Sequence, residues 1–197
     1  MKHIIIATKN KGKAKEFKQF FAPHCIDAIS LLEISEEIKD IDETGNTFAE
    51  NAMIKAEEMR DLLQQPILAD DSGLEIDALD GRPGIYSARY AGEEKNDQAN
   101  IDKVLDDLRM VSFTKRTARF VCVLAVARPG HTTIYRTGTC EGFIALSQKG
   151  DNGFGYDPIF IPNGYTCTMA ELSSEEKNKI SHRSKALEKL EEWIRHL

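Results

Sequence analysis

An apolar run that leads directly into two adjacent aspartates constrains the fold of this chain most. Residues 67–74 read Ile-Leu-Ala-Asp-Asp-Ser-Gly-Leu. Such a run predicts a buried strand that reaches the surface at a polar edge. Because an ionised carboxylate is costly to bury alone, the pair indicates a nearby cation, a substrate or a hydrogen-bonded turn. An Asx-type turn built on Asp70 and Ser72 explains the same residues without any function.

The order of the predicted elements indicates an α/β protein with a mixed sheet and flanking helices. Strands and helices alternate in the first half, hairpins follow, and helices close the chain. Residues 85–92 are interpreted as either a substrate-lining loop or a packed surface hairpin. The predicted strands cover residues 3–7, 25–29, 67–69, 74–78, 117–127, 159–161 and, as one or two strands, 132–145; the helices cover 14–21, 47–65, 97–108, 173–180 and 181–194.

Length and composition describe an ordinary globular protein. The 197 residues suit a single domain, of one or two lobes, that buries about 70% of its unfolded surface. The four cysteines are widely separated in sequence, which indicates reduced residues of a cytoplasmic protein instead of a zinc or redox motif. No stretch resembles a signal peptide or a membrane span. With a net charge of −6, the chain is not expected to bind nucleic acid or a membrane.

A lysine-rich segment lies between the first predicted strand and the first predicted helix. It consists of Thr8, Lys9, Asn10, Lys11, Gly12 and Lys13. A loop at this place can bind phosphate, because backbone N–H groups and the helix dipole point toward it. It is not a Walker A loop, since the leading glycine is missing and Ala14 follows Lys13. Lysines that are merely solvated are the simpler interpretation.

Two later segments could contribute to a binding site. Residues 150–158 carry three glycines with Phe154 and Tyr156 between them, which would permit close approach to a flat ligand. The alternative is a loop whose aromatic side chains anchor it to the core. His182 and Arg183 open the last predicted helix, where they suit an anion or a carbonyl group, although a surface arginine there is also common.

The motifs, taken in their order, resemble those of the inosine triphosphate pyrophosphatase family, the non-canonical purine nucleoside triphosphate pyrophosphatases. The resemblance covers essentially the whole chain. The matching motifs are Ala-Thr-Lys-Asn-Lys-Gly-Lys (7–13), Glu-Thr-Gly (43–45), Glu-Asn-Ala (50–52), Ala-Asp-Asp-Ser-Gly-Leu (69–74), Pro-Gly-Ile-Tyr-Ser-Ala-Arg-Tyr (83–90), Gly-Phe-Gly-Tyr-Asp-Pro (153–158) and Ser-His-Arg (181–183).

This resemblance implies a function and an assembly. The expected reaction is magnesium-dependent hydrolysis of ITP, dITP and XTP to the monophosphate and pyrophosphate, which removes these nucleotides from the pool and prevents their incorporation into DNA and RNA. The expected fold is an elongated single domain over residues 1–197 with a central cleft between two lobes. The expected assembly is a homodimer.

The resemblance also implies site residues. Residues 8–13 become the triphosphate loop, with Thr8, Asn10 and Lys13 at motif positions. Asp71 becomes the general base and a magnesium ligand, and Ser72 a substrate contact. The second acidic metal position falls on Asp42, where the family usually has glutamate, so that Asp42 could bind the metal directly, bind it through water, or yield to Glu43. The remaining nucleotide contacts fall on Phe154, Gly155, Tyr156, Asp157, Lys177, His182 and Arg183, with Phe154 stacking on the base.

These assignments agree with the chemistry that the reaction needs. Magnesium prefers oxygen ligands and is commonly held by one or two carboxylates together with substrate phosphates. Neighbouring side chains of an extended segment point to opposite faces, so we assign Asp71 to the metal and the attacking water and Asp70 to a supporting role. Arg183 is expected to face the 6-oxo group of the base, which would disfavour adenine nucleotides.

Two other functions fit part of the pattern. Adjacent aspartates suggest a phosphatase with an aspartyl nucleophile, although such enzymes separate the two aspartates by one residue so that both face the metal. A non-catalytic nucleotide sensor would use the carboxylates only to hold magnesium. Pyrophosphate release from ITP distinguishes the pyrophosphatase from both.

Overall fold

A mixed sheet organises the chain. The computed structural model describes residues 3–34, 38–39 and 41–194, so part of the acidic stretch 33–43 lies outside the described residues. Within them the strand order is β2-β1-β3-β4-β5-β6; β1 pairs in parallel with β2 and β3, and β5 pairs antiparallel with β6. This confirms the α/β class with a mixed sheet. The strands are β1 (His3–Ile6), β2 (Asp27–Ser30), β3 (Ile67–Ile76), β4 (Thr117–Ala127), β5 (Ile134–Ile144) and β6 (Phe160–Pro162).

The described residues divide into two compact units. The first unit holds the residues up to Asp71, residues 123–137 and the residues from Ala186 on; the second unit holds residues 72–122 and 138–185. Three strands, β3, β4 and β5, contribute residues to both units. The helices are α1 (Lys11–Phe21), α2 (Phe48–Leu63), α3 (Asp97–Asp107), α4 (Ser174–Ile180) and α5 (His182–Ile194).

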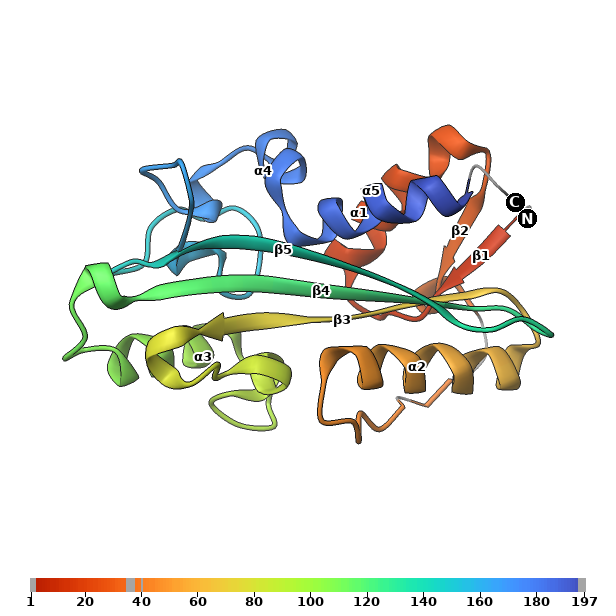
Figure 1. Cartoon of the computed structure of the whole chain (residues 1–197), viewed down its shortest axis with the longest axis horizontal. Coiled ribbons are helices and arrows are strands. Elements are labelled where there is room, and N and C mark those ends of the chain that lie inside the picture. The colour runs from red at the N-terminus through yellow and green to blue at the C-terminus, as the bar shows by residue number, and fades with distance from the viewer. Residues whose placement is uncertain (1–2, 35–37, 40, 195–197) are drawn as a thin grey trace. The chain divides into compact units, whose positions relative to one another are not determined.

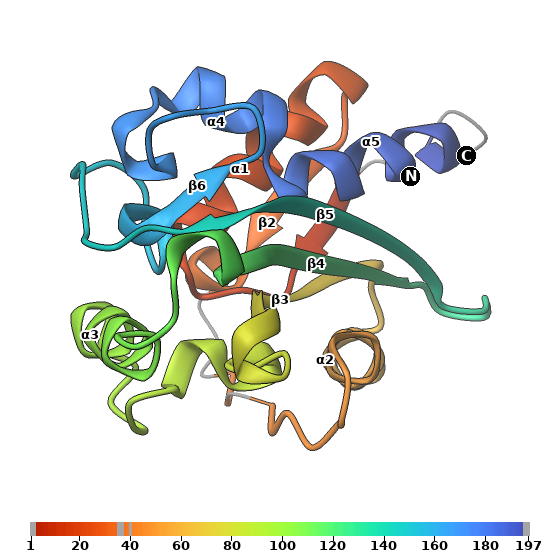
Figure 2. The same cartoon turned by 60° about the vertical axis from the view of Figure 1, so that its left-hand side comes forward.

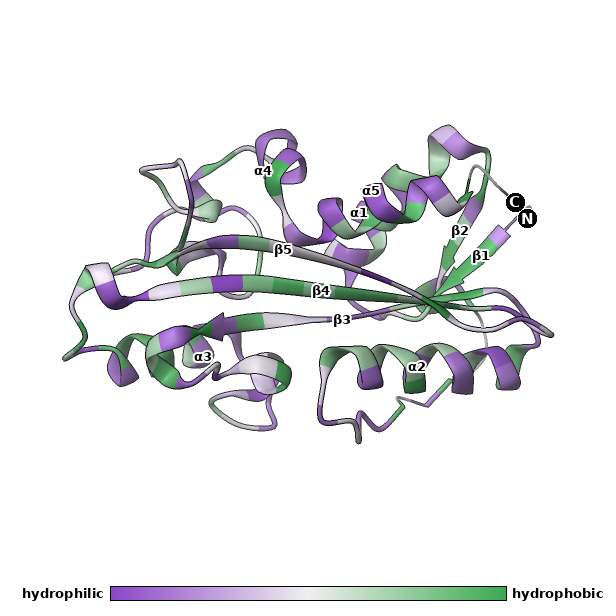
Figure 3. Cartoon of the chain, in the orientation of Figure 1, coloured by the Kyte–Doolittle hydropathy of each residue, from purple (hydrophilic) through white to green (hydrophobic). Residues whose placement is uncertain are grey.

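Helices cover both faces of the strands in the first unit. In that unit α2 lies on one face, and α1 and the part of α5 from Ala186 on lie on the other (Figure 1, Figure 2). This explains why β1 is apolar at successive positions, since Ile4, Ile5 and Ile6 are all buried. Figure 3 shows the same pattern, with β1 hydrophobic and α2 alternating between hydrophobic and hydrophilic residues.

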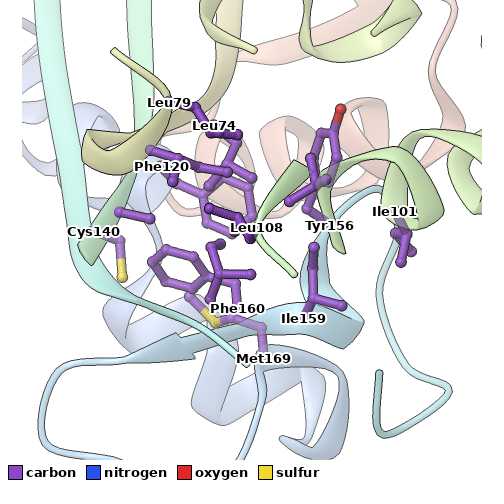
Figure 4. Close-up of a cluster of buried hydrophobic side chains, with 14 of the residues drawn as sticks. Leu74, Leu79, Ile101, Leu108, Phe120, Cys140, Tyr156, Ile159, Phe160 and Met169 are labelled. Atoms are coloured by element: carbon purple, nitrogen blue, oxygen red, sulfur yellow. The ribbon is translucent and has the colours of Figure 1, made fainter. Parts of the chain in front are cut away.

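The second unit has its own hydrophobic core. Figure 4 shows side chains from β3, α3, β4 and β6 that meet around Phe120 and Phe160, whose ring centroids are 4.4 Å apart. Ile101 and Val104 of α3 and Leu108 at its C-cap are buried in this core. No described helix is long and apolar enough to cross a membrane.

Helix α1 begins earlier than the sequence predicted. Lys11, Gly12 and Lys13 form its first turn, whereas residues 8–13 were expected to be a loop. The Asn10 side chain caps this turn by accepting a hydrogen bond from the Lys13 N–H at 3.0 Å. The turn contains no apolar residue, so the hydrophobic periodicity started only at Ala14.

Strand β3 continues through the Asp-Asp-Ser-Gly segment, so the predicted turn at this point is wrong. The strand is unbroken from Ile67 to Ile76. Its pairing with β1 covers Ile67 and Leu68, and β4 is its hydrogen-bonded neighbour on the other side. The hairpin alternative for residues 85–92 is also wrong, since Gly84–Arg89 forms a short 3₁₀ helix.

A buried arginine joins the end of α3 to the start of β4. The Arg116 side chain is 4% exposed and donates to three backbone oxygens, those of Val111 at 3.0 Å, Ala145 at 3.0 Å and Leu108 at 2.7 Å. Leu108 and Val111 follow α3, and Ala145 follows β5; the Leu108 oxygen also accepts the Val111 N–H at 2.8 Å. Arg116 therefore satisfies several buried acceptors at once.

We expect Arg116→Met to lower the free energy of unfolding by about 3 kcal/mol, because buried carbonyl groups would lose their hydrogen-bond donors. Urea denaturation measures this change. Arg109→Met is the matched control: the Arg109 side chain is 74% exposed, and its loss should change the free energy of unfolding by less than about 0.5 kcal/mol. Equal effects of the two substitutions would contradict the prediction.

Candidate active site

Asp71 is a buried acid in the middle of β3. It is 7% exposed, and burial raises the pKa of its carboxyl to about 6. The ammonium groups of Lys55 and Lys13 and the nearby Asn51 side chain lower this pKa, while the nearby Glu43 carboxylate raises it. Asp71 can therefore exchange a proton close to neutral pH, which is the property that a general base needs.

Asp70 and Asp71 have different neighbours, as expected for adjacent residues of a strand. The Asp70 carboxylate is 2% exposed and lies 2.7 Å from the Lys13 ammonium, on α1. Asp71 lies near Asn51 and Lys55, both on α2, and these two residues lower its pKa. Since α1 and α2 cover opposite faces in this unit, the two carboxylates serve opposite faces (Figure 1).

Lys55 connects the segment before α2 to β3. Its ammonium is 2.6 Å from the Glu43 carboxylate and donates to the backbone oxygen of Asp70 at 3.2 Å. Sequence reasoning missed both Lys55 and Asn51. The available signal was their spacing of four residues, which places both on the same face of α2.

The segment that carries Glu43 is held close to the start of α2. The Gly45 N–H donates to the Asn51 side-chain oxygen at 2.8 Å, and a Cβ on Gly45 would lie 2.6 Å from the Cβ of Glu50. Only glycine permits this approach. Glu43 is thereby half-buried, whereas Asp42 is exposed.

The donor set fits a magnesium ion that is bound together with a substrate. No cluster of three or more metal-ligating side chains was found within the described residues. Magnesium held by one or two carboxylates and by substrate phosphates needs no such cluster. Asp71 and Glu43 supply two hard carboxylates with an electrostatic interaction between them.

The lysine-rich segment places its polar groups around the N-terminus of α1. Thr8 is buried, and its hydroxyl accepts the Asn10 N–H at 3.2 Å. The Lys9 ammonium donates to the backbone oxygen of Ile38 at 3.0 Å, whereas Lys11 is exposed. Lys13 therefore places a positive charge beside Asp70 of β3, and Lys9 places one beside the segment that precedes α2.

In the second unit, Asp157 organises the glycine-rich segment. Its carboxylate is buried and accepts the Phe154 N–H at 2.9 Å and the Lys177 ammonium at 2.6 Å. The Lys177 ammonium lies 4.4 Å from the centroid of the half-buried Phe154 ring. The Arg183 guanidinium lies 5.9 Å from the same centroid. The structure therefore brings together Phe154, Asp157, Lys177 and Arg183.

Ser72 and the start of α5 belong to the same neighbourhood. The Arg183 guanidinium is 2% exposed and donates to the Ser72 hydroxyl at 3.3 Å. The His182 ring stacks on Phe120 with 4.9 Å between centroids. His182 thus packs against the core of the second unit, and Arg183 presents hydrogen-bond donors beside Phe154.

Tyr156 is placed differently from the sequence expectation that it holds the base. Its side chain is 5% exposed and belongs to the hydrophobic core, and its hydroxyl donates to the backbone oxygen of Ser87 at 2.7 Å (Figure 4). This agrees with the alternative in which an aromatic residue anchors the loop. Gly155 contributes its backbone N–H, which donates to the Asp97 carboxylate at 2.8 Å.

Known proteins resemble this chain over nearly its whole length. A family model described as the Ham1 family matches residues 4–193. The dITP/XTP pyrophosphatase of Oceanobacillus iheyensis is 62% identical, and the match covers 98% of each chain. The dITP/XTP pyrophosphatase of Bacillus subtilis is 56% identical with the same coverage.

Solved structures share the fold. The Ham1 protein of Staphylococcus aureus matches with a TM-score of 0.88 and 46% identity over 99% of each chain. The HAM1 protein of Coxiella burnetii matches with a TM-score of 0.91 and 42% identity over all of each chain. The matches confirm the resemblance found in the sequence and the inferred enzyme class, a nucleoside triphosphate pyrophosphatase. The chain belongs to the Ham1 family.

We expect Asp71→Asn to stabilise the protein at neutral pH. Because the pKa of Asp71 is about 6 in the folded state and 3.8 ordinarily, wild-type stability falls as the pH rises from 4 through 6. Asparagine stays neutral at all these pH values. The free energy of unfolding of the variant, relative to that of the wild type, should therefore increase by about 3 kcal/mol as the pH rises from 4 to 7. Urea denaturation with a chelator present measures both proteins, and a constant difference across this range would contradict the assignment.

Proposed function

We propose that this protein hydrolyses the non-canonical purine nucleoside triphosphates dITP, XTP and ITP to their monophosphates and pyrophosphate, with magnesium. The observation that carries the proposal is the buried Asp71, whose pKa is about 6 and which has Glu43, Lys55 and Lys13 as charged neighbours. The names of the relatives support the choice of dITP and XTP. The sequence resemblance supports ITP.

Asp71 is the general base in this proposal. Its carboxylate takes a proton from a water molecule whose oxygen attacks the α-phosphorus, and the bond from that phosphorus to the bridging oxygen of the β-phosphate breaks. Pyrophosphate leaves with the electron pair of the broken bond. Lys13 and the N-terminus of α1 stabilise the charge on the phosphates, with Thr8 and Asn10 shaping the turn.

A magnesium ion, bound by Asp71 and Glu43 with the phosphates, would supply charge neutralisation at the triphosphate. Lys55 holds the Glu43 carboxylate against β3, which orients this ligand. Asp70 supports the site by fixing the Lys13 ammonium. Among the described acids, Glu43 is thus a better candidate for the second ligand than the exposed Asp42.

Residues of the second unit recognise the base in this proposal. Phe154 supplies a ring for stacking, and Arg183 supplies donors for a 6-oxo group. An amino group at that position would face a donor, so adenine nucleotides would leave a buried guanidinium without its acceptor. Ser72 fixes the Arg183 guanidinium, and His182 anchors the start of α5 on Phe120.

The proposed reaction would cleanse the nucleotide pool and keep deaminated purines out of DNA and RNA. We place this activity in the cytoplasm, a reducing compartment, because the four cysteines, all among the described residues, form no disulfide. Homodimer formation is proposed from the family resemblance alone.

We expect the wild-type protein to release pyrophosphate from dITP, XTP and ITP with a kcat/KM at least about 100-fold above that for ATP, because an amino group in place of the 6-oxo group costs several kcal/mol at a desolvated donor. A panel of triphosphates assayed for pyrophosphate and orthophosphate measures this. Orthophosphate as the sole product would indicate a phosphatase, and absence of turnover with excess magnesium would indicate a nucleotide sensor.

The control for this panel is Asp71→Asn, which keeps the size of the side chain and removes the base. Its kcat should fall by about 100-fold or more. Retention of more than about a tenth of the wild-type kcat would exclude Asp71 as the base.

A pair of substitutions tests which acid is the second metal ligand. We expect Glu43→Gln to raise the magnesium concentration for half-maximal rate by about tenfold or more, because an amide oxygen is a weaker ligand than a carboxylate. Asp42→Asn is the matched control. It should leave that magnesium concentration unchanged, because the Asp42 side chain is exposed and is not expected to bind the metal. The opposite pattern would reassign the ligand to Asp42.

A further inference from the structure

The segment that presents Phe154 has little conformational stiffness of its own. Gly150, Gly153 and Gly155 have φ values of +78°, +82° and +59°, a region that L side chains rarely adopt. A Cβ on Gly153 would lie 2.0 Å from the Asp157 carboxylate. Glycine is therefore required here, and it also increases the conformational freedom that folding must remove.

Two consecutive backbone N–H groups of this segment bind two different carboxylates. The Phe154 N–H donates to Asp157 at 2.9 Å, and the Gly155 N–H donates to Asp97 at 2.8 Å. Asp157 belongs to the segment itself, and Lys177 holds its carboxylate. Asp97 lies 58 residues away in sequence, in the first turn of α3. The backbone on both sides of the Phe154 Cα is thus fixed to different elements.

The contact with α3 is polar because the two elements do not pack closely there. A cavity of about 340 Å³ lies between the start of α3 and the glycine-rich segment, lined by Asp97, Gln98, Ile101 and residues 150–155 among others. Besides Asp97, Gln98 connects the two sides by donating to the Gln148 oxygen at 3.0 Å. Gln148 precedes the glycines, and Tyr156 anchors the segment to Ser87 beyond them. Between these two contacts, the Gly155 N–H donates to Asp97.

We propose that Asp97 is a positioning residue for purine recognition: it accepts the Gly155 N–H and thereby fixes the backbone that presents the Phe154 ring. This inference rests on the proposed function, because it assumes that Phe154 stacks on the base. In this proposal Asp97 acts on the base only through the backbone that carries Phe154. Its position at the start of α3 is supported independently by Asn96, which caps the helix by accepting the Ala99 N–H at 3.0 Å.

Substitutions at Asp97 test the proposal. We expect Asp97→Ala to raise the KM for dITP by about tenfold, because a lost charge-assisted hydrogen bond frees the loop. The inhibition constant of inorganic tripolyphosphate, which has no base, should stay unchanged. Asp97→Asn keeps a side-chain oxygen acceptor and should restore the KM to within about twofold of wild type. Asp106→Ala, which removes an exposed aspartate from the same helix, is the matched control for the loss of charge.

Hydrogen–deuterium exchange gives a readout that does not depend on activity. The amide protons of residues 150–157 should exchange at least about fivefold faster in Asp97→Ala and at the wild-type rate in Asp97→Asn and Asp106→Ala. Unchanged exchange in Asp97→Ala would show that the hydrogen bond between the Gly155 N–H and Asp97 does not fix the segment. Faster exchange with an unchanged KM would overturn its role in recognition. A wild-type protein that releases no pyrophosphate would instead overturn the proposed function. The exchange data would still show whether Asp97 fixes the backbone of this segment.

Discussion

Two adjacent carboxylates inside a central strand are the constraint on which the first unit depends. A charge buried in β3 needs compensation, and helices on both faces provide it. Lys13 of α1 pairs with Asp70, and Lys55 of α2 and Lys13 both interact with Asp71. The helices that cover the sheet thus also carry the cations that a triphosphate requires. The compensation at Asp71 is incomplete, since burial still raises its pKa to about 6. That imbalance destabilises the fold at neutral pH and suits a base.

In the second unit, the main structural feature is a glycine-rich segment, residues 150–158, that carries the flat ring of Phe154. Asp157 is the centre of this arrangement, because a single buried carboxylate accepts both a backbone N–H and the Lys177 ammonium. Lys177 in turn lies beside the Phe154 ring. Tyr156, between them in sequence, points into the core and joins the segment to Ser87. Tyr156 thus packs into the core, while the half-buried Phe154 ring lies beside Lys177 and Arg183.

The elements were largely predictable, and the errors have identifiable causes. Strand β4 was predicted with its observed bounds, and α2 and α3 nearly so, because strong periodicity or capping residues mark them. The start of α1 was missed because its first turn is polar. The turn predicted at Ser72 was wrong because Gly73 and the acids resemble a loop locally, whereas pairing with neighbouring strands keeps β3 extended.

The candidate site divides in the same way between sequence and structure. The sequence by itself determined the family, the enzyme class and the chemistry of the acids and lysines, because these depend on residue types in a fixed order. Tertiary structure decided which of them meet: Glu43 in place of Asp42 beside Asp71, Lys55 between them, and Asp97 at the backbone of Gly155. Such contacts join residues far apart in the chain, and local periodicity carries no information about them.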